Sequence, residues 1–138
     1  MPLSAPIQSG GTFTPSLTFG GAAVGLVTTT NVGTFTRVGD RIFYSIQIIL
    51  SAKGSSVGAV AISGFPVPAA STPTNTTYPA IAMTQNMAAG ITAFPAATIN
   101  VGQSNLFLFK EVAGVQTAVA DTDMTATTQI AISGHYAV

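Results

Sequence analysis

The clearest alternation of apolar and polar positions in the chain runs through residues 41–51. Every second side chain is apolar and the side chains between them are mixed: Ile42, Tyr44, Ile46, Ile48 and Leu50 on one face, Phe43, Ser45, Gln47, Ile49 and Ser51 on the other. Successive side chains of a β-strand point to opposite faces of its sheet. The pattern therefore predicts a strand with one face in the core. Its mixed face suits contact with a neighbouring chain better than contact with water.

A second strand-like run comes directly before this one. Gly33–Val38 is separated from Arg41–Ser51 by the two residues Gly39 and Asp40. A two-residue connection containing glycine favours a tight hairpin turn with positive φ angles. We expect the two runs to pair as an antiparallel hairpin.

Further short β-patterned runs follow one another along the chain, separated by Gly, Pro and Asn. They are Thr12–Phe19, Leu26–Thr30, Ala59–Phe65, Tyr78–Asn86, Gly90–Ile99, Asn105–Val112, Val115–Ala120 and Thr127–Ala137. Pro15 interrupts the first run, which we therefore place at a sheet edge. Short strands at near-regular intervals predict an all-β sandwich or barrel over residues 12–138. Residues 1–11, with two prolines and a Gly-Gly pair, predict a short extended N-terminal arm.

Charged side chains are unusually scarce. The chain has 138 residues, of which 6% are charged and 47% hydrophobic, with a net charge of zero and no cysteine. An ordinary soluble domain has about 25% charged residues. Four basic residues cannot provide the cationic surface that nucleic-acid binding needs, and no apolar run approaches the length of a membrane span. The composition favours a subunit of an assembly, with neither nucleic acid nor a membrane as its partner.

The sequence offers little material for catalysis or metal binding. His135 is the single histidine and shares a strand face with Gln129 and Ser133, which predicts a polar surface or interface position. Asp121 and Asp123 could begin a calcium site, but such a site needs more oxygen ligands, so turn chemistry is the favoured interpretation. We predict no catalytic residues, no metal site, no cofactor and no enzymatic activity.

The interface prediction combines the arm with the mixed face of the hairpin. Arg37 and Arg41 flank the hairpin turn, where they either pair with Asp40 on the surface or contact another subunit. The complete set of predicted interface residues is Pro2, Leu3, Pro6, Ile7, Arg37, Arg41, Phe43 and Gln47.

Four segments in order resemble a module of tailed-phage virion proteins that is often found at the ends of tail fibres. They are GTFTPSLTFGG, NVGTFTRVGDRIFYSIQIIL, VAISGFPVP and DMTATTQIAISGHYAV. The resemblance implies a jelly-roll-like antiparallel β-sandwich and a homotrimeric virion protein, made in the bacterial host cytoplasm.

Two functions are compatible with this resemblance. The module makes up nearly the whole chain, so the leading hypothesis is a capsid decoration (cement) protein that binds between subunits of the major capsid protein. The alternative is a receptor-binding or tip module of a tail fibre, with a host-surface glycan as ligand. A glycan-cleaving enzyme is a distant third possibility, because no placed pair of acids is evident.

Overall fold

The computed structural model describes residues 8–71, 77–88 and 96–138. Its strands are β1 (Gln8–Phe13), β2 (Ser16–Phe19), β3 (Val27–Val38), β4 (Arg41–Ala52), β5 (Val60–Ser63), β6 (Thr77–Met87), β7 (Ala96–Asn100), β8 (Leu106–Val112), β9 (Val115–Ala118) and β10 (Met124–Ala137). A single 3-10 turn, Asp121–Asp123, is the only helical element of the described residues.

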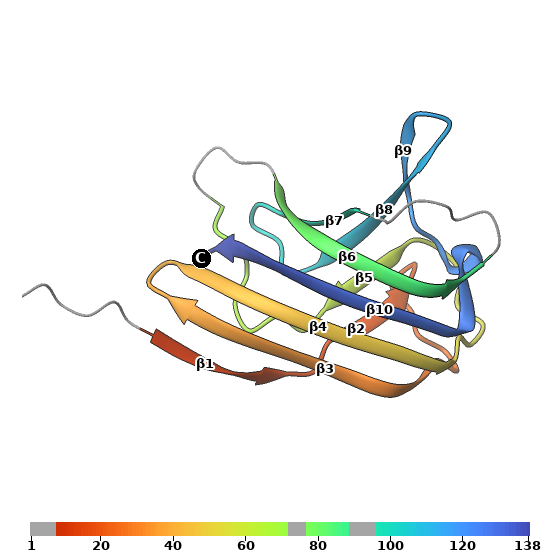
Figure 1. Cartoon of the computed structure of the whole chain (residues 1–138), viewed down its shortest axis with the longest axis horizontal. Coiled ribbons are helices and arrows are strands. Elements are labelled where there is room, and N and C mark those ends of the chain that lie inside the picture. Colours follow the sequence, from red (N-terminus) through yellow and green to blue (C-terminus); the bar gives the residue numbers. More distant parts are fainter. Residues whose placement is uncertain (1–7, 72–76, 89–95) are drawn as a thin grey trace, which may run out of the picture.

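All ten strands belong to one antiparallel sheet, in the order β1-β3-β4-β10-β6-β7-β8-β5-β2, with β9 paired to β8. The sheet curls over, so that β1 and the long strands β3, β4, β10 and β6 form one layer and β7, β8, β5 and β2 lie behind it, while β9 projects beyond the layers (Figure 1). This architecture confirms the predicted all-β, jelly-roll-like antiparallel sandwich.

The expected central hairpin is present. β3 and β4 pair from Val38↔Arg41 onward, and Gly39 adopts a positive φ of 59° in the turn between them. The alternation along β4 is also confirmed, because Ile42, Tyr44, Ile46, Ile48 and Leu50 are buried. Among the predicted outer residues of this strand, Phe43, Ser45, Gln47 and Ser51 are exposed.

An aromatic cluster joins the two layers. Phe65, just after β5, packs edge-on against Tyr44 of β4 and Tyr136 of β10, with ring centroids 5.0 and 5.8 Å away. The Tyr136 hydroxyl donates a hydrogen bond to the Val67 carbonyl at 2.8 Å. The cluster therefore ties the segment after β5 to the middle of the opposite layer.

The N-terminal part differs from the prediction. The run Thr12–Phe19 was expected to be one edge strand, but β1 and β2 lie at opposite edges of the sheet. Pro15 has no N–H to donate and separates them, while its carbonyl accepts a 2.7 Å hydrogen bond from the Asn31 side chain. Residues 8–11, assigned to the arm, pair with β3 as part of β1. The rest of the arm, residues 1–7, lies outside the described residues.

Other strand boundaries differ from the predicted ones by smaller amounts. Leu26–Thr30 and Gly33–Val38 join into the single strand β3, which absorbs register shifts between Val27 and Thr30. β10 begins three residues before the expected Thr127, and a further shift lies between Met124 and Gln129. At such register shifts the side chains no longer alternate strictly between the two faces. The alternation of apolar and polar residues in the sequence is therefore interrupted although the strand continues.

Candidate functional site

The candidate site is the solvent-facing side of the long-stranded layer, here called the outer face. Register places its side chains in rows that run across β3, β4, β10 and β6. One row is Thr34, Ser45, Ser133 and Ile81, and the next is Val32, Gln47, Ala131 and Met83. Thr36, Phe43 and His135 form a third row, nearer the hairpin turn.

Large apolar side chains are exposed on this face. Val32, Phe43, Ile81 and Met83 have exposed fractions of 41%, 47%, 76% and 55%. The remaining positions are mainly Ser, Thr, Gln and Ala, and Arg41 is the one Asp, Glu, Lys or Arg on this face among the described residues. An apolar surface with so little charge has the composition of the centre of an interface rather than of a free surface.

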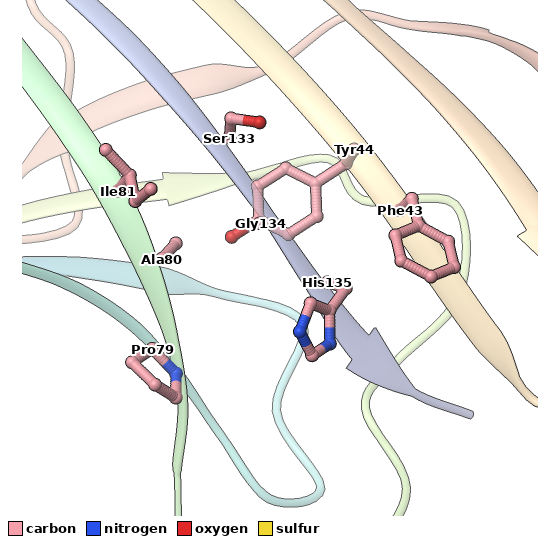
Figure 2. Close-up of a pocket in the computed structure, with 8 residues that line it drawn as sticks. All are labelled: Phe43, Tyr44, Pro79, Ala80, Ile81, Ser133, Gly134 and His135. Carbon is pink, nitrogen blue, oxygen red and sulfur yellow. The ribbon is translucent and has the colours of Figure 1, made fainter.

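A groove of about 490 Å³ lies at the hairpin end of the outer face. Figure 2 shows its lining: Phe43, Tyr44, Pro79, Ala80, Ile81, Ser133, Gly134 and His135. Pairing between β10 and β6 ends at Gly134↔Ala80, directly before Pro79. Since proline has no backbone N–H to donate, it ends this ladder and leaves the space between the two strands open.

Two rings form one wall of the groove. The centroids of Phe43 and His135 are 5.6 Å apart, and their planes are tilted by 47°. The Arg41 guanidinium lies with Nη1 3.1 Å from Nδ1 of His135. Because the guanidinium has only donors, Nδ1 accepts this bond and the proton of the neutral ring sits on Nε2. The expected surface position of His135 is confirmed.

Tyr44 also borders this groove, but its side chain lies on the buried face of β4. Tyr44 is 4% exposed, and its hydroxyl has no hydrogen-bond partner among the described residues. Burial raises the Tyr44 pKa far above its usual range, so the group stays a neutral donor. A buried hydroxyl without a partner costs free energy, so it is an unusual feature of a folded protein.

Glycine is required beside this hydroxyl. Gly134 lies between Tyr44 and Ala80 in the register, and Figure 2 shows the Tyr44 ring reaching across β10 to it. A Cβ at position 134 would lie 2.7 Å from the Ala80 Cβ and 2.9 Å from the Tyr44 oxygen. The absence of a side chain at position 134 thus leaves room for the Tyr44 hydroxyl beside Ala80.

Two smaller hollows lie on the same face. One, of about 240 Å³, is bounded by Thr34, Phe35, Thr36, Phe43, Tyr44 and Ser45. The other, of about 120 Å³, is bounded by Gln47, Met83, Gln85, Gln129, Ile130 and Ala131. The outer face is therefore uneven along its length and offers a partner several hollows.

The structure brings together some of the predicted interface residues and separates another. Arg41, Phe43 and Gln47 follow one another on the outer face of β4. Arg37 pairs with the buried Ile42, so it belongs to the opposite face, and its Nε donates to the Gly39 carbonyl at 2.9 Å. Pro2, Leu3, Pro6 and Ile7 lie outside the described residues. An interface role for all of these residues stays a prediction.

Sequence reasoning missed the contributions of β6 and β10. Ile81 and Met83 are exposed, while the smaller Ala82 between them is buried. Alternation was visible in this run, but the usual rule assigns the larger apolar side chains to the core. The sequence alone does not show which of the two faces is buried, because the burial of each face depends on how the sheet curls.

The two aspartates have structural partners. Asp121 accepts from the Gly58 N–H at 2.8 Å and lies 3.6 Å from the Lys53 ammonium. Asp123 accepts from the Ala120 N–H at 2.9 Å and from Lys110 at 2.5 Å. No group of three or more potential metal-ligating residues occurs in the described parts of the chain. The 3-10 turn therefore uses its carboxylates as caps and ion pairs, which agrees with the turn interpretation.

Asp121 makes folding stability depend on pH. The Gly58 N–H, followed by Lys53, holds the pKa of this carboxyl below its ordinary value. A lowered native pKa stabilises the fold above the unfolded-state pKa, and the contribution is lost as pH falls through the native value. We expect Asp121→Asn to flatten the loss of stability in acid, as measured by urea unfolding at a series of acidic pH values. Asp40→Asn, which removes an exposed turn carboxylate, is the matched control; an Asp121→Asn slope equal to those of the wild type and of Asp40→Asn would contradict the assignment.

Comparisons with known proteins reveal a likeness of fold. No protein-family model matches the chain, and no curated protein matches it. The crystal structure of the Dettilon tailspike protein contains a region with the same fold, with a TM-score of 0.76 at 20% sequence identity. The match covers 94% of this chain and 24% of the tailspike chain, so this chain spans about a quarter of that protein's length. Within residues 8–71, 77–88 and 96–138, no helix is long and apolar enough to cross a membrane.

Proposed function

We propose that the protein is a non-enzymatic structural module of a bacteriophage virion, which assembles with copies of itself through the outer face. The observation that carries this proposal is the fold shared with a region of a phage tailspike protein over 94% of the chain. The outer face supports it independently, because it combines exposed Val32, Phe43, Ile81 and Met83 with almost no charge. Obligate interfaces between subunits have this apolar character.

The assembly is a homotrimer on the tail of the particle. The tail location is favoured over the capsid because the matching structure is a tailspike. A capsid decoration protein would use the same face against the major capsid protein, so the two locations differ in partner and copy number. The same proposal puts the protein in the virion after synthesis in the bacterial cytoplasm.

The contacts of the acidic residues and of His135 support a role without catalysis. Asp121 and Asp123 are engaged by lysines and backbone N–H groups, and Nδ1 of His135 faces Arg41. A hydrolase of glycosidic bonds needs two free carboxyl groups that face each other across a cleft. The groove of the outer face has neither an Asp nor a Glu in its lining.

Quantitative mass spectrometry of purified virions tests this proposal. We expect the protein in intact particles at the low copy number of a tail component, in a whole-number multiple of three. Hundreds of copies per particle would place the protein on the capsid instead of the tail and would support the decoration hypothesis. Absence from purified virions would contradict the proposal altogether. Sedimentation equilibrium of the isolated protein should give the mass of a trimer, and a monomer at all concentrations would refute self-assembly.

A further inference from the structure

The lining of the groove at the hairpin end of the outer face favours one kind of bound segment. Its walls are the Phe43 and His135 rings, the Pro79 ring and the Ile81 side chain. The residues that line it include no Asp, Glu, Lys or Arg. Extended proline-containing segments dock in aromatic-lined grooves of this type, and their carbonyls accept hydrogen bonds from groove donors.

The chain itself contains a segment of this chemistry. Residues 1–7 read MPLSAPI, with two prolines, three large apolar side chains and no charged side chain. This segment directly precedes β1, whose first residue, Gln8, pairs with Val38 beside the hairpin turn. The groove lies at the same end of the sheet, since it is lined by Phe43 and His135, one row in from the Arg41↔Ala137 pair. Prolines reduce the entropy that an extended segment loses on binding.

We propose that residues 1–7 of one copy dock in the groove of a neighbouring copy, with the prolines and apolar side chains of the segment packed against the Phe43, His135 and Pro79 rings. Seven extended residues span up to about 25 Å, which is enough to cross a subunit boundary and cover the groove. The inference rests on the proposed function only in requiring a second copy of the chain.

The direction of β1 favours a neighbouring groove over the chain's own. β1 runs antiparallel to β3, and its first residue, Gln8, pairs with Val38 at the hairpin end, so the chain enters the sheet from that end. To reach its own groove, the segment would have to reverse at once and cross β3 and β4. Fixed φ angles at Pro2 and Pro6 oppose such a compact path.

Engineered disulfides give a direct test, because the natural chain has no cysteine. Two differently tagged chains are coexpressed, one carrying Leu3→Cys and the other Ile81→Cys, and are mildly oxidised. We expect a disulfide-linked pair of the two tags on a non-reducing gel. The matched control replaces Ile81→Cys with Val115→Cys, which is also well exposed and lies on β9, away from the outer face. Equal crosslinking to both positions, or none to either, would overturn the proposal.

The same cysteines distinguish a neighbour's groove from the chain's own. A single chain carrying both Leu3→Cys and Ile81→Cys should form crosslinked oligomers on oxidation. An internal disulfide alone, with no product in the coexpression experiment, would show that the segment folds back on its own copy and would overturn the exchange between copies.

A peptide experiment tests the groove without relying on assembly. A variant lacking residues 2–7 keeps β1 intact and leaves the groove free, and it is titrated with a labelled peptide of residues 1–9 by fluorescence anisotropy. We expect saturable binding that Phe43→Ala weakens at least tenfold. Val115→Ala and a scrambled peptide serve as controls.

The outcomes keep this inference separate from the proposed function. Peptide binding unaffected by Phe43→Ala, or absent altogether, would overturn the groove assignment even if the protein is a trimer in virions. Conversely, specific peptide binding by a protein that is absent from virions would leave the groove assignment standing and remove the virion role.

Discussion

Replacing Tyr136 with alanine is expected to lower the free energy of unfolding by about 3–5 kcal/mol, as truncations of large buried aromatic residues do. Tyr136 is 1% exposed and packs against both Tyr44 and Phe65. Its hydroxyl also satisfies the Val67 carbonyl. The substitution would leave a cavity where the segment after β5 meets β10, and would remove a contact between the two layers.

Tyr136→Phe is the matched control for this prediction. It keeps the ring and loses only the hydroxyl, so a loss of about 1–2 kcal/mol is expected from one broken hydrogen bond and one unsatisfied carbonyl. Urea unfolding followed by circular dichroism measures both variants, with the midpoint shifting at a nearly constant slope. Equal losses for the two variants would mean that the hydrogen bond, rather than the packing of the ring, joins the layers.

Placing a carboxylate in the middle of the outer face with Ala131→Glu is expected to weaken self-association at least about 100-fold. Ala131 lies on the outer face between Gln47 and Met83 in the register, with no cation in either paired position. Burying an unpaired carboxylate in an interface costs several kcal/mol, and each 1.4 kcal/mol changes an equilibrium constant about tenfold. Because Ala131 is exposed in the single chain, the substitution should leave the fold of the subunit unchanged.

Two control variants isolate the effect of the charge. Ala131→Gln adds an uncharged side chain of nearly the same size as glutamate. Gln116→Glu adds a carboxylate on exposed β9, away from the outer face. Sedimentation velocity over a concentration series should show dissociation only for Ala131→Glu, with circular dichroism spectra alike in all variants. Trimers of undiminished stability in Ala131→Glu would exclude the outer face as the assembly surface.

Parts of the site were predictable from local sequence. The strict alternation of residues 41–51 identified both faces of β4, and the Gly39-Asp40 pair located the hairpin. The spacing of Asp121 and Asp123 indicated turn chemistry, which their contacts with Gly58 and Ala120 bear out. Each of these features depends on neighbours along the chain, such as the pleat of a strand or the φ angles of a turn, and such neighbours are visible in a sequence.

Other parts depended on contacts between distant residues. Nothing local shows that β10 lies between β4 and β6, yet this order creates the groove between Phe43, His135 and Ile81. Arg37 and Arg41 flank the same turn, but register places them on opposite faces. The run around Pro15 has one pattern, while its two halves lie at opposite edges of the sheet.

The sequence by itself determined the strand content, the central hairpin, the inner face of β4 and a surface poor in charge. Only the tertiary structure decided which strands are neighbours, which apolar side chains remain uncovered and where the groove lies. The reason is physical: a strand's two faces are set by its own alternation, whereas its partners are set by non-local hydrogen bonding and packing among all strands at once. Ile81 illustrates the difference, because the sequence shows that it is apolar, whereas its exposure depends on how the sheet curls.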